Sequence, residues 1–467
     1  MQAAVTLQHF SFKYPNQTEP LFHDVQLTIP TGQFWLLRGP SGCGKSTLLK
    51  LVAGLSNQKY QGEIALNRHS LAQLPATERS KLVNLMLQDP NQQFVMQTVA
   101  GELQFALENQ QTEPAQIPER IHAALAFCQI EHLADRQVLS LSGGEKQKAI
   151  LATMVALDSA IFLLDEPFAS IDPQSKRDIL QQLRQLQTER GKTIIISDHD
   201  LNGYQDLVDH VVTVAPKTHE LELLSATAQT ELFARRHQPI QRFTMPATET
   251  GLFWLQDYQI SYGNPALLSV ADLQIPAGCT LLTGPSGSGK STLLRSLSKL
   301  QQYTGQITLN QCNIQKIKNK RYYNQLGLVF QAAPDQFLRI TVAEELELSL
   351  ATSQCSTWNK ETVQQALAKL QLTGHEQQSV YTLSGGQQKK LQILVMLIRH
   401  PQILLLDEPF ASLDQDSIAT VQTLLKQQYQ GPDHLLLVIS HQRFATPGFY
   451  DYHLHLANHT FTYQEAD

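Results

Sequence analysis

The sequence has few cysteines and no long hydrophobic run. No apolar stretch approaches the roughly 20 residues that cross a bilayer, so we expect no membrane span and membrane contact only through a protein partner. The cysteines are scattered over 467 residues without paired metal-ligand spacing, which predicts reduced thiols rather than disulfides or a zinc site. There are five of them: Cys43, Cys128, Cys279, Cys312 and Cys355.

Strong charge and a targeting segment are also missing. The net charge is −6, from 36 basic and 42 acidic residues, which argues against a basic surface for nucleic acid or anionic lipid. The opening "MQAAVTLQHFSF" lacks the charged start and apolar centre of a signal peptide. We therefore expect the chain to stay in the cytosol.

What the sequence does contain is an internal duplication. "GPSGCGKSTLLK" from Gly39 returns as "GPSGSGKSTLLR" 245 residues later, while "LSGGEKQKAI" from Leu141 and "IFLLDEPFASID" from Ile161 both return in similar form after 242 residues. Because the spacing is nearly constant, whole domains were copied. We predict one domain at residues 1–236 and another at 250–467, joined by a polar, proline-containing linker at 237–249.

Each copy begins with β-rich segments and continues with helical patterns that alternate with short apolar strands such as "TIIIS" and "HLLLVIS". This alternation predicts an α/β fold with a mostly parallel central sheet in each domain.

A glycine loop lies between an apolar strand and a helix in both copies. That context places backbone N–H groups and the positive end of a helix dipole around a phosphate. The alternative is a flexible Gly/Ser turn that only caps a helix, but two copies in the same context argue against it. Lys45 and Lys290 are expected to reach the β- and γ-phosphates, and the hydroxyls of Ser46 and Ser291 to ligate Mg²⁺. The predicted ATP-binding residues are Gly39, Pro40, Ser41, Gly42, Cys43, Gly44, Lys45, Ser46 and Thr47 in the first loop, and Gly284, Pro285, Ser286, Gly287, Ser288, Gly289, Lys290, Ser291 and Thr292 in the second.

Acidic pairs end two apolar strands, "IFLLDE" and "ILLLDE", which delivers them to the carboxyl edge of a parallel sheet. We expect Asp165 and Asp407 to hold Mg²⁺ through water, and Glu166 and Glu408 to polarise the attacking water.

Histidines, glutamines and tyrosines also recur at matching places. His199 and His441 follow apolar strands, and their repetition favours a catalytic role over that of a strand-end residue. Gln88 and Gln331 either place an amide oxygen on the metal or are polar loop residues. Tyr14 and Tyr262 either stack under a purine ring or pack in the core.

Glycine loop, Gln, Leu-Ser-Gly-Gly, Asp-Glu and His, in that order, resemble the ATPase of ATP-binding cassette (ABC) transporters, over nearly the whole chain and twice. The resemblance implies two tandem P-loop ABC ATPase domains, each with a mixed core sheet, an antiparallel β subdomain and a helical subdomain, and ATP with Mg²⁺ as cofactors. It also implies composite sites. The Gly39–Thr47 loop would face Ser384, Gly385 and Gly386, and the Gly284–Thr292 loop would face Ser142, Gly143 and Gly144.

A narrower resemblance begins at Gln88. "QDPNQQFVMQTVAGELQFALEN" is similar to ATPases of energy-coupling factor (ECF) and cobalt-type importers, whereas "QAAPDQFLRITVAEELELSL" departs at Ala332 and Ala333. The resemblance implies a bacterial peripheral protein on the cytoplasmic face of the cell membrane. Its partners would be a transmembrane coupling subunit and a substrate-binding membrane component, with vitamin, thiamine-precursor or cobalt/nickel uptake as its task. We expect the two halves to grip different coupling helices.

Other departures concern the signature and the first loop. Glu145 stands where glutamine is usual and where the second copy has Gln387, so the site on the second loop is expected to close less tightly, although both should hydrolyse ATP. Cys43 has Ser288 as its counterpart, and we expect a bulky thiol reagent to inhibit unless ATP is bound.

The competing hypothesis is a soluble tandem ATPase acting on ribosomes or DNA. The ribosomal type has a long charged helical linker and the DNA-repair type has zinc-binding cysteines, and this sequence contains neither. Sugar importers typically have a degraded second loop, whereas "GPSGSGKST" is intact.

Overall fold

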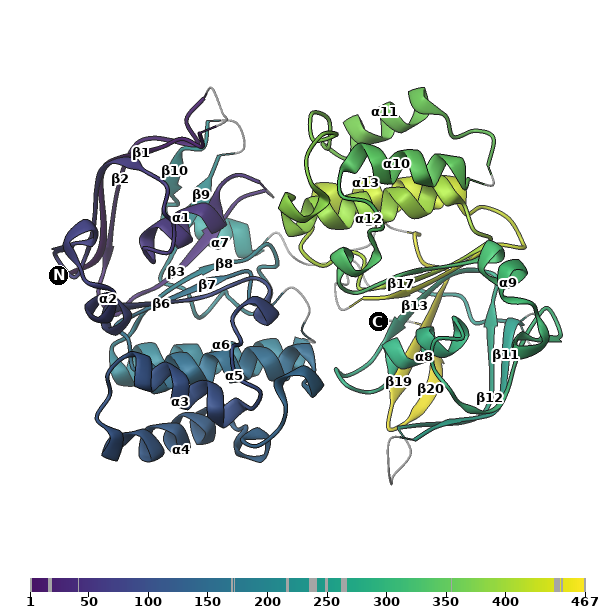
Figure 1. The fold of residues 1–467 in the computed structure, drawn as a ribbon, viewed down its shortest axis with the longest axis horizontal. Coiled ribbons are helices and arrows are strands. Elements are labelled where there is room, and N and C mark those ends of the chain that lie inside the picture. Colours follow the sequence, from purple (N-terminus) through teal and green to yellow (C-terminus); the bar gives the residue numbers. More distant parts are fainter. Residues whose placement is uncertain are drawn as a thin grey trace. The chain divides into compact units, whose positions relative to one another are not determined.

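The computed structural model describes residues 2–15, 19–40, 42–168, 171, 173–215, 218–234, 242–247, 251–261, 267–353, 355–440, 446 and 448–465. The chain divides into two compact units, Met1–His237 and Gln238–Asp467 (Figure 1). Within the described residues each unit has an antiparallel sheet, a mixed and mostly parallel sheet, and helices. The predicted α/β fold is confirmed.

The described strands of the first unit form two sheets. The antiparallel sheet has the order β2 (Phe22–Pro30), β1 (Ala3–Phe12), β4 (Tyr60–Leu66) and β5 (His69–Ser70). The mixed sheet has the order β10 (Leu221–Leu223), β9 (His210–Val214), β3 (Phe34–Arg38), β8 (Thr193–Ser197), β7 (Ile161–Asp165) and β6 (Val83–Met86). Neighbouring strands of the mixed sheet are parallel except at β10, which runs antiparallel to β9.

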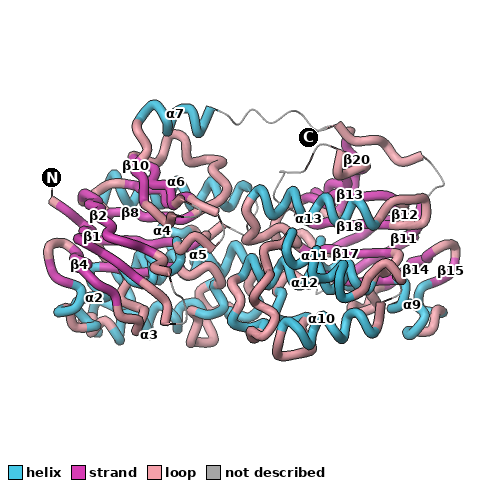
Figure 2. Tube along the Cα trace, turned by 90° about the horizontal axis from the view of Figure 1, so that it is seen from above, coloured by secondary structure: helices cyan, strands magenta, loops and turns pink. Residues whose placement is uncertain are grey.

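Both faces of this mixed sheet are covered, which explains its continuous apolar strands. Phe34 and Leu36 of β3 pack against the helical layer, whereas Trp35 and Leu37 face the first helix and the antiparallel sheet. Figure 1 shows α5 and α6 lying along one face of the sheet. The helices are α1 (Lys45–Val52), α2 (Ala76–Leu82), α3 (Val99–Asn109), α4 (Ile117–Cys128), α5 (Gly143–Leu157), α6 (Pro173–Arg190) and α7 (Ala226–Ala234), the last at the rim of the unit in Figure 2.

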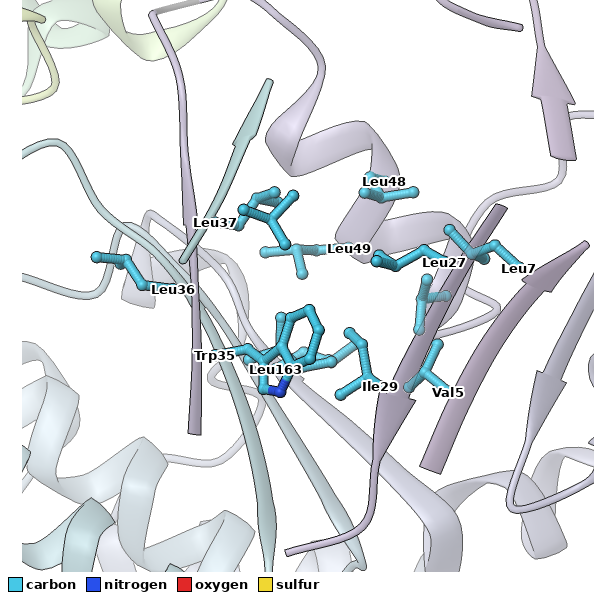
Figure 3. A pocket seen from close by; sticks show the side chains of 13 residues that line it. Val5, Leu7, Leu27, Ile29, Trp35, Leu36, Leu37, Leu48, Leu49 and Leu163 are labelled. Atoms are coloured by element: carbon cyan, nitrogen blue, oxygen red, sulfur yellow. The ribbon is translucent and has the colours of Figure 1, made fainter. Parts of the chain in front are cut away.

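A cavity of about 30 Å³ lies between α1 and the two sheets of the first unit (Figure 3). Leu7, Ile29, Trp35, Leu49 and Leu163 are among the apolar side chains that line it. A water molecule needs several polar partners to be stable in such a space. The cavity is therefore part of the packed core rather than a ligand site.

The second unit repeats the plan. Its antiparallel sheet has the order β12 (Leu268–Pro276), β11 (Gly251–Ile260), β14 (Thr304–Leu309) and β15 (Cys312–Asn313), and its mixed sheet the order β16 (Leu326–Val329), β17 (Ile403–Asp407), β18 (Leu435–Ile439), β13 (Gly278–Thr283), β19 (Tyr452–Ala457) and β20 (Thr460–Gln464). The described helices are α8 (Lys290–Leu297), α9 (Asn319–Gln325), α10 (Val342–Ala351), α11 (Lys360–Lys369), α12 (Gly385–Arg399) and α13 (Gln415–Gln428). None of the helices in the described parts of the chain has the length and apolar character needed to cross a bilayer.

Part of the expected linker packs against the second unit. Phe243 is buried in the core of that unit, beside the ring of His453 at 4.9 Å between centroids. Its backbone N–H donates to the Glu465 carbonyl at 2.9 Å, and that of Thr244 to the Asp451 carbonyl at 2.8 Å. Residues 243 and 244 are therefore attached to the second unit next to the start of β19 and the end of β20.

Candidate functional site

Four strand ends of the first unit meet at the carboxyl edge of its mixed sheet. β3 leads into the Gly39 loop, β7 ends at Asp165, β8 leads to His199, and β6 leads to Gln88. The parallel register aligns these ends, with Leu37 and Asp165 both opposite Ser197. Residues far apart in the sequence are thereby brought to one place, where open α/β sheets bind their ligands.

The glycine loops adopt conformations that other residues would strain. Gly44 and Gly289 start α1 and α8 with φ of 104° and 105°, in the left-handed region that favours glycine. At Gly284, with φ of 149°, an added Cβ would lie 2.3 Å from the Leu456 carbonyl oxygen. The loops can therefore bring backbone N–H groups close to a bound phosphate.

Each loop lysine folds back over its own loop. Lys45 Nζ donates to the Gly39 and Pro40 carbonyls at 2.9 and 3.1 Å, and Lys290 Nζ donates to the equivalent carbonyls at 2.8 and 2.7 Å. Both lysines are nearly fully buried. Of the predicted site residues, Ser41, Tyr262 and His441 lie outside the described residues.

Glu166 lies among three of the predicted residues. Its Oε1 is 2.5 Å from His199 Nε2 and 3.5 Å from Lys45 Nζ, while Gln88 Nε2 donates to its Oε2 at 2.8 Å. Burial raises the pKa of Glu166, but His199 and Lys45 together lower it further, so the net pKa is below the usual value. The carboxylate is therefore ionised at neutral pH and can accept a proton.

Asp165 is held by two hydroxyl groups. Ser197 Oγ donates to its Oδ1 at 2.8 Å, and Ser46 hydrogen-bonds to the same carboxylate. In the second unit Asp407 is likewise bonded to Ser291. Burial raises the pKa of both aspartates, against these hydrogen bonds. Adjacent carboxylate and hydroxyl oxygens are the donors that Mg²⁺ prefers, so the site fits this ion.

Both glutamates have left-handed backbones, with φ of 44° at Glu166 and 49° at Glu408. Their N–H groups donate to the neighbouring strand, at Ser197 O (3.0 Å) and Ile439 O (3.1 Å). Such conformations cost energy and gather at functional sites. Their repetition at equivalent positions indicates that the direction of these side chains is under constraint.

The Ser-Gly-Gly segments begin long helices. Ser142 caps α5 through a capping box with Glu145, whose Oε2 accepts from Ser142 N at 2.8 Å. Ser384 caps α12 in the same way with Gln387 (2.9 Å). The glycines of the first turns are Gly143, Gly144, Gly385 and Gly386. Each unit thus presents a second helix N-terminus able to bind an anion.

A model of the family described as "ABC transporter" matches residues 22–169 and 268–411. This chain belongs to the ABC transporter family. It is similar to the "Putative HMP/thiamine import ATP-binding protein YkoD" of Bacillus subtilis (strain 168), with 29% identity over 489 aligned positions that cover 96% of this chain and 88% of the relative.

Other matches also extend over nearly the whole chain, through both domains. A "Putative ABC transporter ATP-binding protein" of Methanosarcina acetivorans is 28% identical, over 94% of this chain and 85% of its own length. The solved structure "Model of ribosome-bound archaeal Pelota and ABCE1" has a TM-score of 0.70 at 18% identity, covering 96% of this chain and 76% of that chain. At this identity the likeness shows only that the two-domain fold is shared.

Tyr14 and Cys43 were both expected to lie at the first ATP site. Tyr14 Oη hydrogen-bonds with Thr47 Oγ1 at 2.7 Å, so the Tyr14 side chain lies against the first glycine loop. The ring also contacts that of Phe12. The thiol of Cys43 points into the core and is 2% exposed, and burial raises its pKa. Both effects disfavour the reactive thiolate, so the structure argues against the expected modification of Cys43 by a bulky reagent, which stays an untested prediction.

Lys389 and Ser197 were not predicted. Lys389 reads as one more polar residue in "LSGGQQKKLQ", yet it is buried next to the acidic end of β17. The signal available in the sequence was the comparison of the two copies, which places Gln147 at the equivalent position.

Proposed function

We propose that this ABC protein is the ATP-hydrolysing subunit of an ECF-type importer, with two ATP sites completed between its halves. The observation that carries the proposal is the convergence of Lys45, Asp165, Glu166 and His199 at one sheet edge. Glu166, ionised and bonded to His199, is suited to take a proton from an attacking water. His199 then stabilises and orients the carboxylate.

The metal is Mg²⁺, which when bound neutralises charge on the phosphates. Ser46 and Asp165 would hold it in the first site, and Ser291 and Asp407 in the second. Gln88 is hydrogen-bonded to Glu166 through its amide nitrogen, which leaves its oxygen for the metal. Gln331 is the equivalent residue in the second unit.

Each site is completed by the other half. The loop from Gly39 would face Ser384, and the loop from Gly284 would face Ser142, because each capped helix start adds a second group of N–H donors for the γ-phosphate. Bound ATP would then stabilise the closed arrangement of the two halves, and hydrolysis would let the halves separate. This arrangement accounts for two copies of the signature in one chain.

The partner surface is an exposed apolar patch on each unit. In the first unit, the segment with Val95 and Met96 lies beside that of Leu139, since Val138 N donates to Gln97 O at 2.8 Å. In the second unit the exposed residues are Leu338, Ile340 and Tyr381. Exposed apolar clusters of this kind mark protein interfaces, and we assign them to short helices of a transmembrane coupling subunit.

The transported solute is proposed to be a thiamine precursor. The support is the name of the Bacillus subtilis relative, which spans nearly all of this chain. Other vitamins and cobalt or nickel remain within the same importer class.

The test is co-purification from detergent-solubilised membranes. We expect integral membrane proteins to accompany the wild-type chain, and Leu338→Asp with Ile340→Asp to release them. Leu300→Asp, at another exposed leucine beyond the end of α8, serves as the matched control. Sedimentation with ribosomes in place of membrane partners would support the competing hypothesis.

A further inference from the structure

Lys389 lies inside the second unit, under the start of the segment that carries Gln331. Its side chain belongs to α12 and is 5% exposed. Lys389 Nζ donates to the carbonyl of Phe330 at 3.1 Å, and Gln392 Nε2 donates to the same carbonyl at 3.0 Å. The ammonium group is therefore fixed in place by a backbone acceptor.

The ammonium group of Lys389 lies beside the acidic end of β17. Val329 pairs with Leu406 in the parallel register of β16 and β17, so Phe330, which accepts from Lys389, and Asp407 follow at the same level of the sheet. Burial lowers the pKa of Lys389 to about 8, against Asp407 and Glu408, which raise it. Burial raises the pKa of Asp407, and the charge of Lys389 lowers it more than the charges of Arg295 and Lys290 do. The two carboxylates favour the charged form of Lys389, and charges interact strongly where water is excluded.

The first unit lacks this charge. Gln147 follows Glu145 by two residues, as Lys389 follows Gln387, and it is equally buried at 3% exposure. Lys45 of the glycine loop is a positive charge that lowers the pKa of Asp165. The second unit therefore has a buried positive charge at a position where the first unit has a neutral side chain.

We propose that Lys389 is a positioning residue that weakens Mg²⁺ binding at the second nucleotide site, making the two sites of the chain unequal in their affinity for metal-bound nucleotide. The inference rests on the proposed function, in which Ser291 and Asp407 hold the metal. A neighbouring cation lowers the affinity of a carboxylate for protons and for other cations alike. We expect an effect on the order of tenfold, the size usual for one close opposite charge.

The test uses the full chain, a non-hydrolysable ATP analogue and Mn²⁺ as a paramagnetic stand-in for Mg²⁺, with free Mn²⁺ measured by electron paramagnetic resonance. The wild type should show two classes of Mn²⁺ affinity. Lys389→Gln should tighten the weaker class about tenfold, because glutamine can still donate to the Phe330 carbonyl while the charge is gone. Lys389→Arg keeps the charge and should behave as the wild type.

Gln147→Lys is the reciprocal variant and should weaken the tighter class. An unchanged or weakened Mn²⁺ isotherm in Lys389→Gln overturns the inference, and so does an effect confined to Lys389→Met, which would show that only the hydrogen bond matters. If Lys389→Gln fails to fold, Gln147→Lys decides, and unchanged Mn²⁺ affinities in it contradict the role of the charge. Failure of the wild type to bind the nucleotide at all would instead remove the proposed function.

Discussion

His199 Nε2 lies 2.5 Å from Glu166 Oε1 in the first unit. The two residues follow adjacent parallel strands, β8 and β7, whose register brings Ser197 opposite Asp165. The histidine favours the ionised carboxylate and, with Lys45, lowers its pKa despite burial. A glutamate kept ionised in a nearly dry site is suited to act as a base.

Replacing both glutamates should stop hydrolysis without preventing ATP binding. Glu166→Gln with Glu408→Gln removes the proton acceptor but keeps the size and most hydrogen-bonding capacity of each side chain. We expect the rate of ATP hydrolysis to fall on the order of a hundredfold or more, while equilibrium binding of ATP stays near that of the wild type. Glu78→Gln, at an exposed glutamate of α2, is the control, and unchanged turnover in the double variant would remove these residues from the mechanism.

The charge of Glu145 should weaken ATP binding at the second loop. Its carboxylate lies 3.6 Å from Arg136, which partly offsets the charge. Glu145→Gln keeps the capping box, as Gln387 does in α12, and should tighten ATP binding there by roughly two- to fivefold, the range of a partly exposed charge. Gln387→Glu should have the opposite effect at the first loop. Equal ATP affinities before and after both changes would show that the signature position does not act through charge.

A buried ion cluster should stabilise the first unit. Lys176 of α6 contacts Asp198 at 3.0 Å and Asp200 at 3.1 Å. Lys176→Met leaves these carboxylates without their cation and should lower the free energy of unfolding of the first unit by about 3 kcal/mol. Urea denaturation followed by a probe in that unit measures the loss. Lys81→Met, at an exposed pair with Glu78, should change stability by less than about 1 kcal/mol.

His400 should make the second unit less stable in mild acid. Burial lowers the pKa of His400, as does the facing ring of His434, while Gln428 raises it; Tyr429 is the other ring in contact. As the pH falls below about 6.5, the unfolded chain binds this proton before the folded chain does, so stability decreases.

His400→Asn tests this pH dependence, because asparagine tolerates the φ of 53° found at this helix end. The fall in denaturation midpoint between pH 7.5 and pH 5.5 should be smaller in this variant than in the wild type. His122→Asn, at an exposed histidine of α4, should retain the full dependence. An equal fall in all three proteins would contradict the assignment.

Local patterns were enough to predict the fold and the place of most site residues. "IFLLDE" identifies a buried strand with acids at its end because strand length, apolarity and the following charges all lie within a few residues. Local patterns could not predict the burial of a side chain that is covered by elements far away in the sequence. Three buried groups are examples, because each is covered by elements far away in the sequence: the ammonium of Lys389, the ring of Phe243 and the thiol of Cys43.

The proposed pairing of each glycine loop with the Ser-Gly-Gly segment of the other half can be tested at a single site. In a Lys45→Ala, Glu408→Gln background, ATP should be held mainly on the Gly284 loop and should not be hydrolysed there, and its dissociation rate can be measured after dilution. Adding Ser142→Arg, in the other half, should speed the release of ATP, whereas adding Ser384→Arg, in the same half, should not. Faster release caused by Ser384→Arg alone, or by neither change, would contradict the account.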